Sequence, residues 1–190
     1  MIEKYVVIGG SAGSFQTVLK LLEEFPKNYP YPVFLVLHRL KNVRNGFIEA
    51  LSIKSKLKLT EPSNKEPIKG GRVYLAPANY HMYIQPDKTF SLSTEETINH
   101  SRPSIDITFS SAAFSLREQL VGVLLSGANK DGSFGLKNIS KYNGLTIVQD
   151  PNDSQIQTMP QAALDIFKVD KILSSKEIIK FVTNLHLRYV

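Results

Sequence analysis

Short, continuous runs of apolar residues alternate along the chain with longer segments in which apolar residues recur every three or four positions. Continuous apolar runs that end at glycine or proline are typical of strands buried in a parallel sheet, whereas the longer spacing predicts amphipathic helices. The predicted strands are 4–10, 31–38, 57–62, 119–127, 145–150 and 171–174, and the predicted helices are 14–25, 45–55, 103–117, 131–144, 159–167 and 175–190. This alternation predicts an α/β fold, a doubly wound and mostly parallel sheet with helices on both faces.

The segment 70–96 departs from this pattern. Its apolar and polar residues alternate, and the turn signals PAN and PDK interrupt it, which predicts strands and a β-hairpin. We expect the hairpin at an antiparallel edge of the sheet. The sequence contains no internal repeat, linker or low-complexity tract, so we expect one domain over 1–190.

Composition narrows the classes of function. The chain has 190 residues and no cysteine, which excludes disulfides, thiolate catalysis and cysteine zinc sites. Its four histidines do not pair at helical ligand spacing, so no metal site is expected. The apolar run VFLVL is far shorter than the roughly 18 residues that a membrane span needs, and the start MIEKYVVIGG leaves no room for a signal peptide. We therefore expect a cytoplasmic protein without direct membrane insertion.

The charge suggests an acidic partner. The formal net charge is +6, which favours association with a nucleic acid, a membrane surface or an acidic protein. The lysines are spread along the chain without a run of five or six. A clustered basic stripe is the usual footprint of a nucleic-acid site, so we expect no nucleic-acid partner.

Three predicted strands end in residues that can do chemistry. Ser11 follows the first strand, His38 ends the second, and Asp131 follows the strand 119–127. Ligands of parallel α/β sheets bind beyond the carboxyl ends of the strands, so these side chains can meet in one crevice. Serine, histidine and aspartate form the set that acyl transfer uses. Each also has an ordinary structural explanation, as a helix cap or a packed ring, but the combination at three strand ends favours a catalytic site.

The stretch GGSAG at 9–13 distinguishes between kinds of site. It fails the dinucleotide pattern G-x-G-x-x-G, because Ser11 or Ala12 stands where the second glycine belongs. A phosphate-binding P-loop requires a Gly-Lys pair, and the chain has none. The stretch does match G-x-S-x-G between a predicted strand and a predicted helix, which is the context of a nucleophile elbow. A nucleotide-binding oxidoreductase is therefore the weakest alternative.

Six segments of the chain are similar to segments of a known protein family and occur in the same order: VVIGGSAG, VFLVLHR, GRVYLAPANYHM, RPSIDITFSSAA, GVLLSGANKDGSFGL and TMPQAAL. The chain resembles the catalytic domain of the chemotaxis protein-glutamate methylesterases, the CheB family, over roughly 4–185. The resemblance implies that Ser11 is the nucleophile, His38 the general base and Asp131 the acid of a triad. The order of the three differs from that of α/β-hydrolases, consistent with convergent geometry.

The resemblance also implies a reaction and a partner. The reaction is hydrolysis of glutamyl γ-methyl esters with release of methanol, and deamidation of glutamine, without a metal or organic cofactor. The partner is a methyl-accepting chemotaxis receptor, whose cytoplasmic helical bundle is typically acidic. We expect the backbone N–H groups of Ala12 or Ala128 to bind the oxyanion. We also expect Gly10, Gly13 and Met159 to line the site.

The chain departs from the family pattern near each triad residue. Ala12 replaces a hydroxyl residue after the nucleophile, and Leu37 and Arg39 flank the histidine in place of glutamine and methionine. In the acid loop, Ala128 replaces a methionine and Asn129 a glycine. These changes suggest an alternative function as a catalytically weakened adaptor or binding module in chemosensory signalling. The three retained triad residues favour an active enzyme, slower or differently selective.

Two further pairs of residues carry chemical groups of interest. His81 and Met82 lie in the segment ANYHM; they can flank the crevice, but we expect them to pack. Arg102 and Asp106 stand at the start of the predicted helix 103–117. We expect an ion pair or a cap there rather than direct chemistry.

Overall fold

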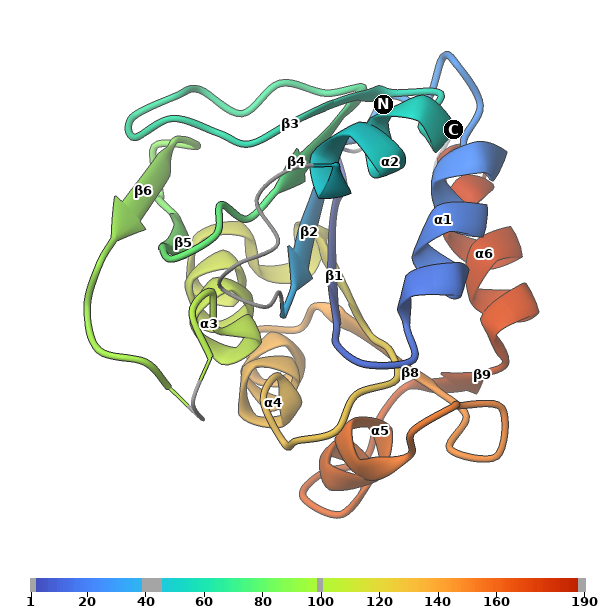
Figure 1. The fold of residues 1–190 in the computed structure, drawn as a ribbon. Coiled ribbons are helices and arrows are strands. Elements are labelled where there is room, and N and C mark those ends of the chain that lie inside the picture. Colours follow the sequence, from blue (N-terminus) through green and yellow to red (C-terminus); the bar gives the residue numbers. More distant parts are fainter. Residues whose placement is uncertain (1–2, 39–45, 99–100, 188–190) are drawn as a thin grey trace.

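The computed structural model describes residues 3–38, 46–98 and 101–187, which form the α/β arrangement that the sequence predicts (Figure 1). The parallel strands are β1 (Tyr5–Gly10), β2 (Val33–Leu37), β3 (Lys58–Thr60), β4 (Arg72–Leu75), β7 (Leu120–Leu124), β8 (Leu145–Gln149) and β9 (Lys171–Leu173), and a hairpin comprises β5 (His81–Ile84) and β6 (Phe90–Ser93). The helices are α1 (Phe15–Glu24), α2 (Phe47–Lys54), α3 (Ile105–Leu116), α4 (Ser133–Lys141), α5 (Thr158–Leu164) and α6 (Ser175–Thr183).

The order of the strands places a crevice beside β1. In the described chain the large sheet runs β3-β4-β2-β1-β7-β8-β9, with every neighbouring pair parallel. The chain winds outward from β1 to β2 on one side and later returns to β7 on the other side. Crevices that bind ligands form where the winding reverses in this way, at the carboxyl ends of the strands.

Helices cover both faces of the sheet. Figure 1 shows α1 and α6 on one side and α3 and α4 on the other. Along β1, Val6 and Ile8 join the core that contains residues of α1, α2 and α6, while Tyr5 and Val7 join the core that contains residues of α3, α4 and α5. Because the central strands are buried on both faces, their sequences are continuous apolar runs, and this made them predictable.

The middle segment forms three strands, of which β4 joins the parallel sheet between β2 and β3. The other two form the predicted hairpin, but it is a two-stranded sheet of its own and does not extend the edge of the large sheet. Side chains of α3 bond to the backbone of β5 instead. Thr108 Oγ1 donates to Met82 O at 2.7 Å, Ser115 Oγ donates to Ile84 O at 2.8 Å, and Ile84 N donates to Ser111 Oγ at 3.1 Å. Because these bonds satisfy backbone groups of β5, the hairpin packs on α3 without joining the large sheet.

The last helix is shorter than predicted. α6 ends at Thr183, a single 3₁₀ turn follows at Leu185–Leu187, and 188–190 lie outside the described residues. Asn184 Nδ2 donates to Lys180 O at 3.0 Å and so satisfies a carbonyl that the ending helix leaves free. Among the described helices, none is both long and apolar enough to cross a membrane.

Candidate active site

The three predicted site residues lie at the carboxyl ends of three adjacent strands. Ser11 follows β1, His38 follows β2, and Asp131 lies in the loop between β7 and α4. β1 pairs with β2 on one side and with β7 on the other. The sheet therefore brings together residues that are far apart in the sequence.

The turn after β1 is held by hydrogen bonds on both sides of Ser11. Ser11 N donates to Ser126 O at 2.9 Å, and Ser14 donates to Ser11 O through its backbone N at 3.1 Å and its Oγ at 2.7 Å. Ser126 Oγ donates to Ala12 O at 3.1 Å. Gly13 has φ +86°, a backbone conformation that residues with a Cβ adopt only under strain. The side chain of Ser11 makes no hydrogen bond within the described residues, so its Oγ is available to a ligand.

Ser11 and His38 line one pocket of about 240 Å³. Its apolar wall includes Phe15 and Phe47, whose ring centroids lie 5.6 Å apart. The described residues around this pocket are Ser11, Ala12, Gly13, Ser14, Phe15, Leu37, His38 and Phe47. The turn at Ser11 and the side of His38 thus line the same small space.

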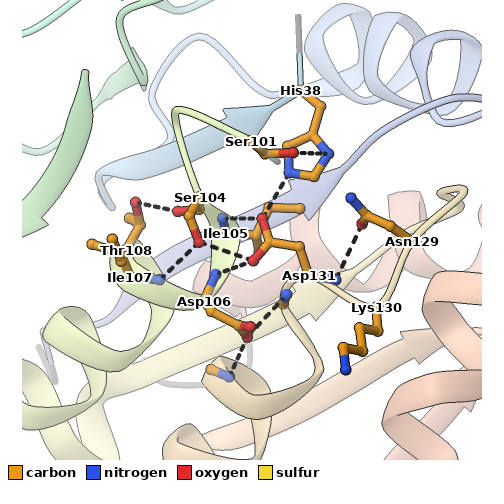
Figure 2. Close-up of polar contacts among 12 residues, drawn as sticks. His38, Ser101, Ser104, Ile105, Asp106, Ile107, Thr108, Asn129, Lys130 and Asp131 are labelled. Carbon is orange, nitrogen blue, oxygen red and sulfur yellow. Dashed lines mark hydrogen bonds and ion pairs between the residues drawn. The ribbon is translucent and has the colours of Figure 1, made fainter. Parts of the chain in front are cut away.

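His38 is held between an acid and a hydroxyl (Figure 2). Its backbone N donates to Gly10 O at 3.2 Å, and its Nε2 lies 2.7 Å from Asp131 Oδ2. An ionised carboxylate only accepts hydrogen bonds, so Nε2 carries the proton and Nδ1 keeps its lone pair. Ser101 Oγ lies 3.3 Å from that Nδ1. The nitrogen able to accept a proton is therefore Nδ1.

Asp131 is fully buried and receives donors from the start of α3. Ile105 N donates to its Oδ2 at 2.7 Å, and Asp106 N and Ser104 Oγ donate to its Oδ1 at 3.1 and 2.9 Å. Burial alone raises the pKa of Asp131, but the hydrogen bonds from His38 and from these backbone amides outweigh it and lower the pKa below its ordinary value. The carboxylate therefore stays charged at neutral pH and can stabilise an imidazolium at His38.

Asp106 holds the helix that follows the acid loop. Its Oδ1 accepts Gly132 N at 2.9 Å and Gly135 N at 2.7 Å, so it caps α4. Burial, together with the charge of Asp131, raises the pKa of Asp106 to about 6 despite the donors from α4. The sequence suggests a contact at the start of its own helix, but the carboxylate caps the neighbouring helix. Arg102 Nη1 instead donates to the carbonyl oxygens of Thr94 and Glu95.

Asp106→Asn is expected to stabilise the protein at neutral pH by ~1–2 kcal/mol, because the asparagine Oδ1 can accept the same two amides without a buried charge. The pKa of Asp106 is raised from 3.8 to about 6, so the folded state binds this proton more tightly than the unfolded chain. The wild-type contribution to the free energy of unfolding therefore falls as pH rises from about 4 to about 6. Urea unfolding at pH 4 and pH 7 should show the gain at pH 7 only. Equal gains at both pH values, or a gain for the exposed Asp165→Asn control, would contradict this explanation.

The remaining predicted site residues differ in position. Ala12 and Gly13 line the pocket, and the N–H of Ala12 has no acceptor within the described residues. Ala128 is exposed on the acid loop and, within the described chain, is not part of the pocket wall. Gly10 contributes its carbonyl to the placement of His38. Met159 is expected to line the site but lies fully buried, and its N donates to the carbonyl of the loop glycine before Ala128 at 3.0 Å.

Sequence reasoning missed the groups that surround the acid. Ser104 and the first amides of α3 lie 25 to 27 positions from Asp131 in the sequence, and no local pattern signals such contacts. Asn129 did carry a local signal. Its Oδ1 accepts Asp131 N at 3.1 Å, a side-chain turn of the kind that asparagine forms two residues before an amide. Asn129 thus helps to fix the loop that carries Asp131.

Comparison with known proteins identifies the family to which the chain belongs. The family model described as CheB methylesterase matches residues 6–182. A protein of Leptospira interrogans named putative protein-glutamate methylesterase/protein-glutamine glutaminase is 40% identical over 180 residues, covering 95% of this chain and 93% of the relative. A protein of Clostridium acetobutylicum named protein-glutamate methylesterase/protein-glutamine glutaminase is 34% identical over 184 residues, but the match spans 53% of its length. The crystal structure of the Thermotoga maritima CheB methylesterase catalytic domain superposes with a TM-score of 0.90 at 29% identity, covering 97% of this chain and 100% of that one. The chain therefore belongs to the CheB methylesterase family.

Proposed function

We propose that this protein is a serine hydrolase that removes methyl groups from glutamyl γ-methyl esters and releases methanol. The observation that carries the proposal is the bond of 2.7 Å between His38 Nε2 and the buried Asp131, beside a pocket that Ser11 and His38 share. The names of the relatives support the substrate and include a protein-glutamine glutaminase activity. Deamidation of protein glutamine is therefore proposed as a second reaction of the same site.

In the proposed reaction, Ser11 Oγ attacks the ester carbonyl while His38 Nδ1 accepts its proton. The negative charge on the carbonyl oxygen is stabilised by backbone N–H groups, each worth about 3 kcal/mol when well aimed. Ala12 is the preferred donor, because it lines the pocket and its N–H has no acceptor within the described residues, whereas Ala128 is exposed outside the wall. The intermediate collapses, and His38 returns the proton to the departing methoxide to give methanol. A water then attacks the acyl-enzyme with the same base, freeing glutamate and Ser11.

Asp131 acts through His38 in this scheme. Its charge and its contact with Nε2 keep the proton on that nitrogen, so that Nδ1 stays a base. The same charge stabilises the imidazolium once Nδ1 has accepted the proton of Ser11. The steps described use these side chains, the backbone N–H of Ala12 and a water molecule.

The proposed substrate is the cytoplasmic helical bundle of a methyl-accepting chemotaxis receptor, so we propose that the protein acts in the cytoplasm. Such bundles are acidic, and the net charge of +6 on this chain favours their encounter. We also propose that 1–190 forms one catalytic domain. The adaptor alternative is disfavoured because Asp131 is bonded to His38 beside the pocket that His38 shares with Ser11, which is the arrangement that acyl transfer uses.

The test is methanol release from methylated receptor fragments at low and high ionic strength, with fluorophosphonate labelling of the same protein. We expect methanol release, labelling of Ser11 and a KM that rises with salt, because exposed charges are screened. Labelling without release would mean that the substrate is wrong. If the protein is not labelled and releases no methanol, the adaptor alternative is favoured. A KM that does not depend on salt would remove the electrostatic argument for the partner.

A further inference from the structure

A second histidine, His81, is linked to Asp131 through Ser104. His81 belongs to β5 and is 0% exposed. Its ring stands between two backbone groups, since Ser104 N donates to Nδ1 at 3.2 Å and Nε2 lies 2.9 Å from Glu96 O. The ring therefore connects the hairpin, the segment after it and the start of α3.

These two contacts determine the state of the ring. A backbone N–H can only donate, so Nδ1 of His81 must accept; a carbonyl oxygen can only accept, so Nε2 must carry a proton. The imidazole is therefore neutral and in one tautomer, and both of its nitrogens are satisfied. A buried side chain with a fixed tautomer and two backbone partners is a rigid support.

Ser104 connects His81 to Asp131. Ser104, whose backbone N is bound to His81, is the N-cap of α3 and is also fully buried. Its Oγ donates to Asp131 Oδ1 at 2.9 Å, and the next two backbone amides donate to the same carboxylate. A displacement of Ser104 would move these donors together, because they belong to one helical turn.

We propose that His81 is a positioning residue for the acid of the triad, and that it acts by fixing Ser104 so that the start of α3 is aimed at Asp131. This inference rests on the proposed function. Asp131 links these donors to His38, whose Nε2 contacts Oδ2, the oxygen that also accepts Ile105 N. Misplacement of a catalytic group by about 1 Å can reduce the rate roughly 100-fold, so loss of the support should act on kcat.

Two amide variants of His81 distinguish the hydrogen bond at Nδ1 from the hydrogen bond at Nε2. The Oδ1 of an asparagine stands close to the position of Nδ1, so His81→Asn can still accept Ser104 N. The amide of a glutamine reaches the position of Nε2, so His81→Gln can still donate to Glu96 O but leaves Ser104 N without its acceptor. Both variants lose one buried hydrogen bond, so similar losses of thermal stability are expected.

The experiment measures kcat and KM below both melting transitions, with His186→Asn as a control remote from the site, beside Tyr29. We expect His81→Gln to lose at least about tenfold in kcat with little change in KM, and His81→Asn to keep most of the wild-type kcat. Equal losses in the two variants, or a larger loss in His81→Asn, would show that His81 serves folding alone and would overturn the proposal.

A second measurement does not depend on turnover. The proton on His38 Nε2 that faces Asp131 should give a downfield resonance in a proton NMR spectrum, with His38→Gln identifying it. We expect this resonance to persist in His81→Asn and to shift or broaden in His81→Gln. An unchanged resonance in both would overturn the proposal. If the wild type releases no methanol but the two variants show the expected NMR difference, the proposed substrate is wrong. The proposal that His81 positions Asp131 would still hold.

Discussion

Ser11→Ala is expected to reduce kcat for ester hydrolysis by roughly 10⁴- to 10⁶-fold, the range seen when a serine nucleophile is removed. The change deletes the atom that attacks the carbonyl and leaves the pocket and the bond from His38 to Asp131 in place. The side chain of Ser11 has no hydrogen-bond partner within the described residues. The free energy of unfolding should therefore change by no more than about 0.5 kcal/mol, and the loss can be assigned to chemistry.

The measurement is methanol release beside fluorophosphonate labelling, with Ser52→Ala as a matched control, since Ser52 is exposed on α2. Ser52→Ala should keep wild-type rates in both assays. Retained release in Ser11→Ala would direct attention to Ser101, whose Oγ lies 3.3 Å from His38 Nδ1. Mapping of the labelled peptide would then decide which of the two serines is the nucleophile.

The positions of the three candidate catalytic residues could be predicted because each follows a strand with a continuous apolar sequence. Parallel strands end at the same edge of a sheet, so Ser11, His38 and Asp131 had to lie near one another once their strands were adjacent. The turn at Ser11 could also be predicted from a local pattern, because such a turn requires small neighbouring residues. What periodicity could not supply was the order of the strands, which depends on contacts between distant segments.

The partners of the acid could not be predicted for the same reason. The amides of Ile105 and Asp106 bond to Asp131 only after α3 has packed across the sheet. The hairpin β5-β6 was predicted, but its separation from the large sheet depends on hydroxyl groups of α3 that bond to β5. His81 was expected to pack, and its burial agrees, yet its two backbone contacts are invisible in a sequence pattern.

Asp131→Asn is expected to lower kcat by about 10⁴-fold, because an asparagine can present an N–H group to His38. In the wild-type protein the carboxylate keeps the proton on Nε2 and leaves Nδ1 as the base. An amide nitrogen in the position of Oδ2 would donate to Nε2, which would then have to release its proton to Nδ1. The nitrogen that should accept the proton of Ser11 would be occupied, so the ring could no longer act as a base.

The amide is also unfavourable in either orientation. With its nitrogen at the position of Oδ2 it faces Ile105 N, and with its nitrogen at the position of Oδ1 it faces Asp106 N, so a donor meets a donor in both cases. A buried donor without an acceptor costs about 1–3 kcal/mol, and for a chain of this size each 1 kcal/mol lowers Tm by roughly 2–4 °C. Asp131→Asn should therefore lose both activity and thermal stability, whereas the exposed control Asp165→Asn should lose neither. Full activity in Asp131→Asn would mean that another residue sets the tautomer of His38. A normal Tm with lost activity would mean that α3 can turn its amides away, which would weaken the case that its first turn is held rigidly against the acid.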